Sequence, residues 1–169
     1  VSDPAAAVSD TENLLSATKG HAIAGKFLTG ASPGVISLFF ANTYYPDFET
    51  YIFAIAEAMR YEYETVTKAG IMLQLDCPDL GMGRHIQYAD LSLSEFRKRA
   101  ELHVEALNHA LANVPKDMVR IHLCWGNYEG PHHCDVPLSD VIDIAFKANV
   151  SGISFEAANP RHAHEYKVF

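Results

Sequence analysis

The sequence has little of what several protein classes require. Its 169 residues include 13 Lys or Arg against 21 Asp or Glu, which gives a formal net charge of −8. Nucleic acids and anionic membranes bind basic surfaces, so neither is expected as a partner. No apolar run reaches the roughly 18 to 20 residues of a membrane span, and no signal-peptide pattern opens the chain. We therefore expect a cytoplasmic protein whose partner is a small molecule or another protein.

Cysteine is also scarce, and its placement is uneven. The chain has only 3 cysteines, an odd and widely spaced set that argues against a disulfide framework. Two of them, with three of the 9 histidines, fall in the segment 120–135. His122 and Cys124 stand two residues apart at the end of an apolar run, so in a strand both side chains point to one face. Zinc accepts His nitrogen and Cys thiolate together.

Hydrophobic periodicity predicts strands that alternate with helices. Residues 1–24 are read as a leader and the end of a helix that starts near Asp10, and 35–40 as a strand continuation or the lip of a loop. The predicted strands are 24–29, 70–76, 118–124 and 150–156, and the predicted helices are 46–68, 92–111 and about 139–149.

This order predicts an α/β fold with a parallel sheet and right-handed crossovers. Polar groups at the ends of successive strands favour a (β/α) barrel over an open doubly wound sheet. In such a barrel the carboxyl ends of all strands lie at one face. A complete barrel takes roughly 250 residues, so four strands predict a partial barrel. We assign residues 25–169 to this domain.

The strand ends suggest a metal site. His122, Cys124 and Glu156 offer one nitrogen, one sulfur and one oxygen ligand, and Cys77, Cys134, His132 and His133 are candidates for a fourth. The competing interpretation is that His122 and Cys124 are buried strand residues and Glu156 a loop charge. Asp76 stands at the end of a predicted strand, where a carboxylate is either a loop cap or a site residue. His103 and His109, in the 92–111 helix, are expected on the solvated surface.

Several segments together resemble one family. Lys26-Phe-Leu-Thr-Gly30 with Pro33, Gln74-Leu-Asp-Cys-Pro78, Arg120-Ile-His-Leu-Cys124 and Ile153-Ser-Phe-Glu156 resemble the catalytic barrel of cobalamin-independent methionine synthase. Residues 124–135 and 155–162 are similar to its shorter methionine synthase II-like relatives. The resemblance runs from about Gly25 onward.

The resemblance implies a zinc-containing TIM-type barrel of the kind shared with uroporphyrinogen decarboxylase. It implies His122, Cys124 and Glu156 as zinc ligands, with a second Cys of the family lying beyond Phe169. It also implies Asp76 as the catalytic carboxylate that binds the amino-acid substrate, and we place Trp125 and His133 beside it in the substrate pocket.

The implied reaction moves a methyl group from the folate co-substrate, 5-methyltetrahydrofolate, to the thiol of homocysteine. Cys77 stands where the family usually has Glu, which leaves the acceptor thiol open. The alternatives are another zinc-thiolate alkyl transfer, such as epoxide opening by coenzyme M, and a non-catalytic fragment. A partial barrel would expose sheet edges that favour self-association.

Overall fold

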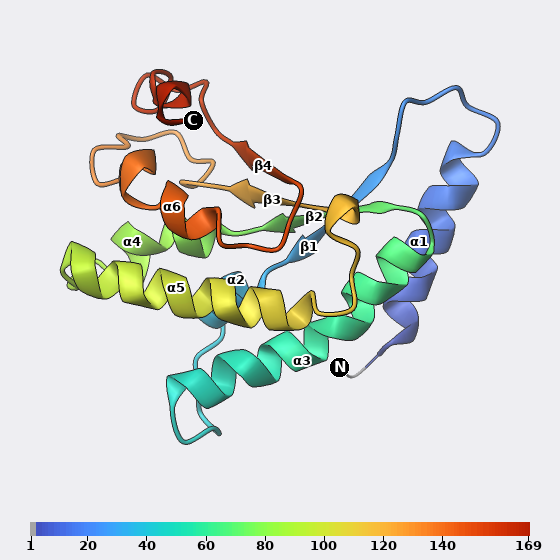
Figure 1. The fold of residues 1–169 in the computed structure, drawn as a ribbon, viewed down its shortest axis with the longest axis horizontal. Coiled ribbons are helices and arrows are strands. Elements are labelled where there is room, and N and C mark those ends of the chain that lie inside the picture. The colour runs from blue at the N-terminus through green and yellow to red at the C-terminus, as the bar shows by residue number, and fades with distance from the viewer. Residues whose placement is uncertain (1–2) are drawn as a thin grey trace.

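A computed structural model describes residues 3–169, and its centre is one parallel sheet (Figure 1). The sheet order is β1-β2-β3-β4, which is also the order along the chain. The strands are β1 Phe27–Ala31, β2 Met72–Asp76, β3 Val119–Leu123 and β4 Gly152–Phe155. The α-helices are α1 Ala5–Thr18, α2 Pro33–Phe39, α3 Phe48–Lys68, α4 Gly83–Ile86, α5 Leu93–Ala110 and α6 Ile142–Ala145. Short 3₁₀ helices cover Pro78–Leu80, Lys116–Met118, Leu138–Asp140 and Glu165–Val168.

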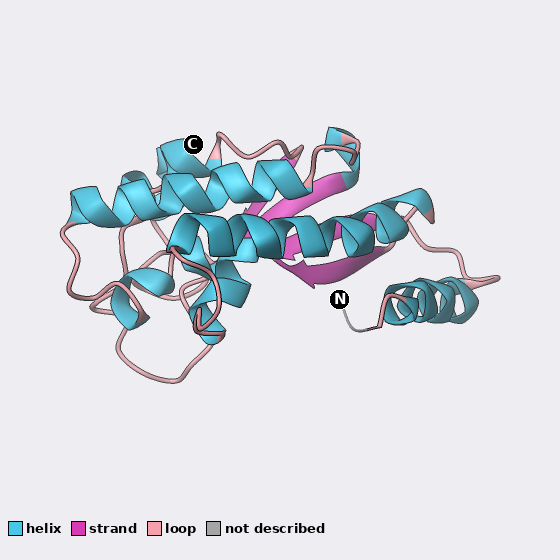
Figure 2. Ribbon diagram, turned by 90° about the horizontal axis from the view of Figure 1, so that it is seen from below, coloured by secondary structure: helices cyan, strands magenta, loops and turns pink. Residues whose placement is uncertain are grey.

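The sequential strand order confirms the predicted α/β fold with a parallel sheet. An open doubly wound sheet reverses its strand order at a switch point and carries helices on both faces. Here the long helices α3 and α5 run side by side on the same side of the sheet (Figures 1 and 2). Within the described residues the chain therefore lacks the switch point of the doubly wound alternative.

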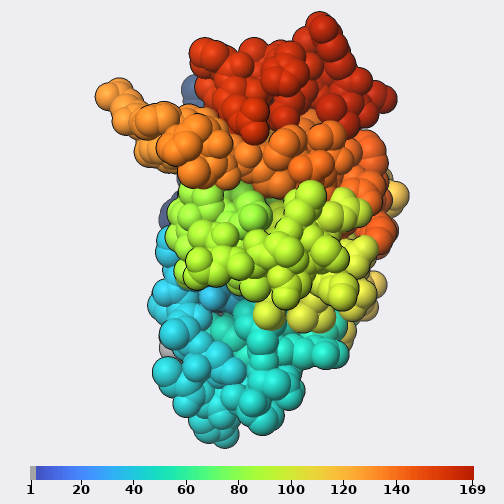
Figure 3. Space-filling model, turned by 90° about the vertical axis from the view of Figure 1, so that its left-hand side faces the viewer, coloured from blue at the N-terminus to red at the C-terminus, as the bar shows by residue number. Residues whose placement is uncertain are grey.

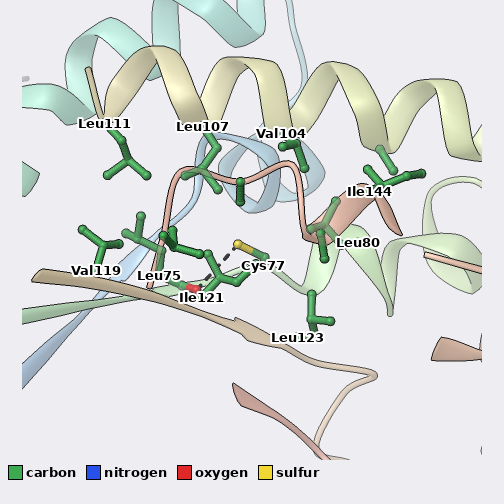
Figure 4. Packing of buried hydrophobic residues seen from close by; sticks show 14 of the residues in the cluster. Leu75, Cys77, Leu80, Val104, Leu107, Leu111, Val119, Ile121, Leu123 and Ile144 are labelled. Atoms are coloured by element: carbon green, nitrogen blue, oxygen red, sulfur yellow. Dashed lines mark hydrogen bonds between the residues drawn. The ribbon is translucent and has the colours of Figure 1, made fainter. Parts of the chain in front are cut away.

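The core lies between the sheet and these helices. Figure 4 shows Val104 and Leu107 of α5, and Leu111 directly after it, pointing toward the buried side chains of β2 and β3. The side chains of Leu75 and Ile121 have no exposed surface. Full burial of one such aliphatic side chain stabilises the fold by about 1.5 to 3 kcal/mol relative to exposure. The helix-facing positions in these two strands are Leu73, Leu75, Val119, Ile121 and Leu123.

The alternate positions of the same strands form a polar, half-buried face. Arg120 Nε donates a hydrogen bond to Gln74 Oε1 at 2.8 Å, and the Arg120 guanidinium lies 4.4 Å from the centre of the Phe27 ring. Asp76 and His122 continue this face toward the carboxyl ends of the strands. Because side chains alternate along a strand, the pattern that builds the core also directs these groups away from it.

The two long helices confirm the predictions for 46–68 and 92–111. The Asp47 side chain accepts a hydrogen bond from the Thr50 N–H at 2.7 Å and caps α3. At the start of α5, Ser92 and Glu95 form a capping box. Such reciprocal caps satisfy backbone N–H groups that have no partner within the helix.

The prediction for residues 35–40 was wrong, because residues 35–39 belong to helix α2 and Phe40 caps its end. Ser32 Oγ accepts a hydrogen bond from the Val35 N–H at 3.0 Å, and Pro33 occupies the first helical position. Serine at the N-cap followed by proline favours a helix start, and it outweighs the apolar run that suggested a strand.

Helices α1 and α6 also differ from their predictions. Helix α1 begins at Ala5 rather than near Asp10, and the Asp3 carboxylate accepts a hydrogen bond from the Ala5 N–H at 3.0 Å. Helix α6 has only 4 residues of the 139–149 prediction. Beyond it the Asn108 side chain donates a hydrogen bond to the Lys147 carbonyl at 2.9 Å and accepts one from the Asn149 N–H at 2.7 Å. These contacts replace further helical hydrogen bonds. Among the described residues, no helix combines the length and the apolar character needed to cross a membrane.

Candidate metal centre

Three predicted metal ligands meet at the carboxyl ends of neighbouring strands. His122 is in β3, Cys124 follows β3 directly, and Glu156 follows β4. Their ligand atoms all lie within 4.8 Å of one another, and each residue is half-buried. The parallel register pairs His122 with Ser154 across β3 and β4, which brings the two strand ends level. The geometry thus brings together the His, Cys and Glu that the sequence predicted.

Neighbouring groups orient the His and Cys side chains. His122 Nδ1 lies 3.2 Å from Ser154 Oγ, so the other ring nitrogen, Nε2, is available to a metal. Cys124 Sγ accepts a hydrogen bond from the Gly126 N–H at 3.3 Å. Gly126 has a φ of +95°, a left-handed conformation that glycine adopts without strain and that turns the chain at this point.

Negative charge surrounds the Cys124 thiol. Burial raises the pKa of Cys124, the Gly126 N–H opposes that rise, and the carboxylates of Glu156 and Asp76 raise the pKa further. A cation bound among these groups would reverse the effect, because a coordinating thiol loses its proton to a bound metal ion. The donor set therefore suits a cation better than it suits a free thiolate.

Asp76 lies beside this group. It ends β2, and the register pairs it with His122 on β3. Residues paired in this way project to the same face, so the carboxylate shares the polar face with the imidazole. Gln74 Nε2 lies 3.5 Å from Asp76 Oδ1. The substrate-binding and catalytic roles of Asp76 stay predictions.

The remaining thiols lie elsewhere. Cys77 is 1% exposed and packs in the hydrophobic core near Leu75 and Leu80 (Figure 4). Burial raises its pKa well above the usual value, which keeps the thiol protonated. Cys134 is exposed on the loop after β3. The structure therefore brings neither candidate into the group of His122, Cys124 and Glu156.

The predicted substrate-binding residues occupy different environments. Trp125 has no exposed surface, and its indole N–H donates a hydrogen bond to the Val136 carbonyl at 2.8 Å. Its ring stacks on His162 with the ring centres 4.1 Å apart. His133 is exposed on the loop. Contact of either residue with a substrate stays a prediction.

The expectation that His103 is solvated was wrong. It is 2% exposed, and its Nδ1 lies 3.0 Å from Asp79 Oδ2 while its ring stacks on Phe48. The helical spacing carries a signal for this placement, since His103 lies seven residues after Phe96 and four before Leu107, both buried. His109, by contrast, is exposed as predicted, with 42% of its side chain accessible.

A second set of ligating groups went unpredicted, because it depends on a contact between distant segments. His132 and Asp135, in the loop after β3, meet His162 of the C-terminal segment, with their ligand atoms within 4.8 Å of one another. The sequence placed His162 in a polar tail, yet the side chain has no exposed surface.

The chain is similar to curated proteins named methionine synthase. Those of five strains of Saccharolobus islandicus are each 29% identical to it over 123 residues. The aligned region covers 71% of this chain but 32% of each relative, so the chain spans about a third of their length. No family model matches the chain, and no solved structure matches it significantly.

Proposed function

We propose that the chain forms part of a zinc-dependent methyltransferase that transfers a methyl group from 5-methyltetrahydrofolate to the thiol of homocysteine. The observation that carries this proposal is the convergence of His122, Cys124 and Glu156 at adjacent strand ends, with ligand atoms within 4.8 Å. The similarity to methionine synthases supports methyl transfer in methionine synthesis.

The donor set fits zinc. Catalytic zinc sites commonly combine three protein ligands with an open fourth position, and zinc accepts nitrogen, thiolate and carboxylate ligands. The fourth position would take water, the acceptor thiol, or a thiolate from outside residues 1–169. When bound, zinc lowers the pKa of a coordinated thiol so that its thiolate is available at neutral pH.

Protein groups around the metal have separate roles in this proposal. Asp76 would accept a charge-assisted hydrogen bond from the ammonium group of homocysteine, because it shares the polar face with His122. Ser154, 3.2 Å from His122 Nδ1, would fix the orientation of the ligating ring. Such outer contacts hold a metal-bound histidine in one tautomer.

We further propose that the sheet is a segment of a TIM-type barrel. In such a barrel every strand is parallel, and the active site lies at the carboxyl ends. The sequential order β1-β2-β3-β4 and the position of the metal centre at that end fit this arrangement. In this fold the half-buried face with Gln74 and Arg120 would line the barrel interior.

Cobalt substitution tests the metal centre. A Co²⁺ ion bound through Cys124 is expected to show thiolate-to-cobalt charge-transfer absorption in the near ultraviolet. The band should disappear in Cys124→Ser and persist in Cys134→Ser, whose thiol is exposed outside the centre. A wild-type protein without this band, or a Cys124→Ser variant that keeps it, would refute the assignment.

Activity assays test the reaction itself. Wild-type protein loaded with zinc should form methionine from homocysteine and 5-methyltetrahydrofolate, and Asp76→Asn should mainly raise the KM for homocysteine. Coenzyme M with an epoxide serves as the comparison, because the identity of the acceptor thiol was open from the sequence. Methyl transfer to neither thiol, in protein that binds the metal, would contradict the proposed reaction.

The partial barrel also suggests self-association. Strands β1 and β4 form the two edges of the sheet, with unpaired backbone groups that can pair with another chain. We expect light scattering to show species larger than the 18.7 kDa monomer. A monodisperse monomer would contradict this expectation and leave the metal assignment unaffected.

A further inference from the structure

A second group of metal-ligating side chains joins the loop after β3 to the C-terminal segment. Asp135 Oδ2 lies 2.6 Å from His132 Nδ1 and 2.8 Å from His162 Nε2. The side chains of Asp135 and His162 have no exposed surface, and that of His132 is 14% exposed. Two imidazoles thus converge on one buried carboxylate oxygen.

A third imidazole faces the other oxygen of the same carboxylate. His85 Nδ1 lies 3.3 Å from Asp135 Oδ1. Both atoms are buried, and neither has a hydrogen-bond partner among residues 3–169. Buried polar atoms almost always have a partner. His85 Nδ1 and Asp135 Oδ1 lie close together without the geometry of a hydrogen bond, so this carboxylate oxygen is left without a donor.

The far side of His162 is already occupied. His162 Nδ1 lies 2.6 Å from Glu165 Oε2, and Glu165 Oε1 accepts a hydrogen bond from the Leu138 N–H at 3.0 Å. A neutral imidazole has one N–H, and in this tautomer it points to Glu165. The lone pair of Nε2 then faces Asp135 Oδ2, which is repulsive unless a cation or a second proton lies between them. Histidines that ligate metals typically donate their other N–H to a carboxylate in this way.

We propose that His132, Asp135 and His162, whose ligand atoms lie within 4.8 Å of one another, bind a divalent transition metal of the zinc type, and that Glu165 positions His162. Two imidazole nitrogens and one carboxylate favour zinc and its neighbours over calcium or magnesium, which prefer oxygen ligands. Metal bonds of about 2.0 to 2.2 Å separate tetrahedral ligands by roughly 3.3 Å. Asp135 therefore has to withdraw by about 0.5 to 0.7 Å from each of the two nearer nitrogens, which small side-chain rotations allow.

Cavities on two sides give access to this second site. One, of about 440 Å³, is lined by His85 and Asp135, and another, of about 410 Å³, is lined by His132 together with Glu156 of the candidate metal centre. The loop projects beside the C-terminal segment at the end of the molecule seen in Figure 3. A metal here would cross-link the two segments and fix one wall of the cavity that Glu156 lines.

Cobalt binding in the Cys124→Ser background separates the second site from the first. The expected result is one equivalent of Co²⁺ with visible d–d absorption but without thiolate charge transfer. Adding His132→Ala should weaken this binding by at least tenfold. Adding Glu165→Gln should weaken it by about 10- to 100-fold, because only the orientation of His162 is affected.

Matched controls use exposed histidines of the same segments. Adding His133→Ala or His164→Ala to Cys124→Ser should leave Co²⁺ affinity unchanged, since both side chains are exposed. Circular dichroism of each variant confirms that it is folded. The proposal is overturned if Cys124→Ser takes up less than a tenth of an equivalent, or if addition of His132→Ala leaves binding as tight as in the controls. Either result would mean that these side chains form a hydrogen-bonded cluster without a metal. Failure of the proposed function is distinguishable, because it appears as the absence of the thiolate charge-transfer band in the wild-type protein.

Discussion

Gly34→Ala is predicted to destabilise the protein, although alanine is normally the better helix former. Gly34 lies in the first turn of α2, against the buried side chain of Asp79. A Cβ at this position would overlap the Asp79 carboxylate and lie 2.9 Å from His103 Nδ1. The carboxylate cannot move freely, because Ser32 Oγ donates to its Oδ1 at 2.8 Å and His103 Nδ1 lies 3.0 Å from its Oδ2.

The magnitude follows from these contacts. Hydrogen bonds to a charged group contribute about 1.5 to 3 kcal/mol each, and the displaced carboxylate loses both of them, because the added Cβ overlaps its central carbon as well as Oδ2. Alanine in place of glycine within a helix raises the free energy of unfolding by up to about 1 kcal/mol, which offsets part of this loss. The expected loss in the free energy of unfolding is therefore about 2 to 5 kcal/mol, a large part of the 5 to 15 kcal/mol typical of a domain.

Urea unfolding measures this loss. With a slope near 2 kcal/mol per molar, the midpoint for Gly34→Ala should fall by about 1 to 2.5 M. Gly25→Ala is the matched control, since a Cβ there meets no atom within 4 Å and the residue is exposed. A midpoint for Gly34→Ala within error of that control would refute the steric reasoning.

Other predictions address pH, thiol reactivity and the core. Burial raises the pKa of Tyr88 to about 12, so its contribution to stability is complete below the ordinary tyrosine pKa of about 10 and is lost as the pH rises toward 12. Urea unfolding from pH 9 to 11.5 should show this decline, and Tyr88→Phe should reduce its slope. Alkylation should modify Cys134 first, Cys124 more slowly and Cys77 only after unfolding, in the order of their exposure, and mass spectrometry detects each product. Early labelling of Cys77 would contradict its burial. Tyr63→Phe should cost about 1 kcal/mol, because the buried hydroxyl donates a hydrogen bond to the Ala31 carbonyl, and an unchanged urea midpoint would count against that bond.

Strongly periodic segments were predictable from local information. The apolar stripe of α5 and its Ser92–Glu95 capping box are both written in adjacent residues, so the helix could be placed within two residues of its observed ends. The prediction for the α2 segment was wrong because its apolar run has no clear period. The sequence signal that indicates a helix there is the Ser32-Pro33 start. Short apolar runs are ambiguous between strand and helix for this reason.

Parts of the candidate metal centre were also predictable from the sequence. The spacing of His122 and Cys124 and the alternation of side chains along β3 determined that both project from one strand end. The meeting of Glu156 with them followed from the parallel order of neighbouring strands, which the alternating pattern predicted.

Only the tertiary structure decided which of the other polar residues come together. His103 and Asp79 are 24 residues apart, and His162 and Asp135 are 27 apart, so no local pattern records either contact. Burial of a charged or polar side chain is tolerated only when the fold supplies its partner, and that partner is set by packing between distant segments. The sequence therefore determined the strand order and one group of ligands, whereas packing of the C-terminal segment against the loop after β3 created the second.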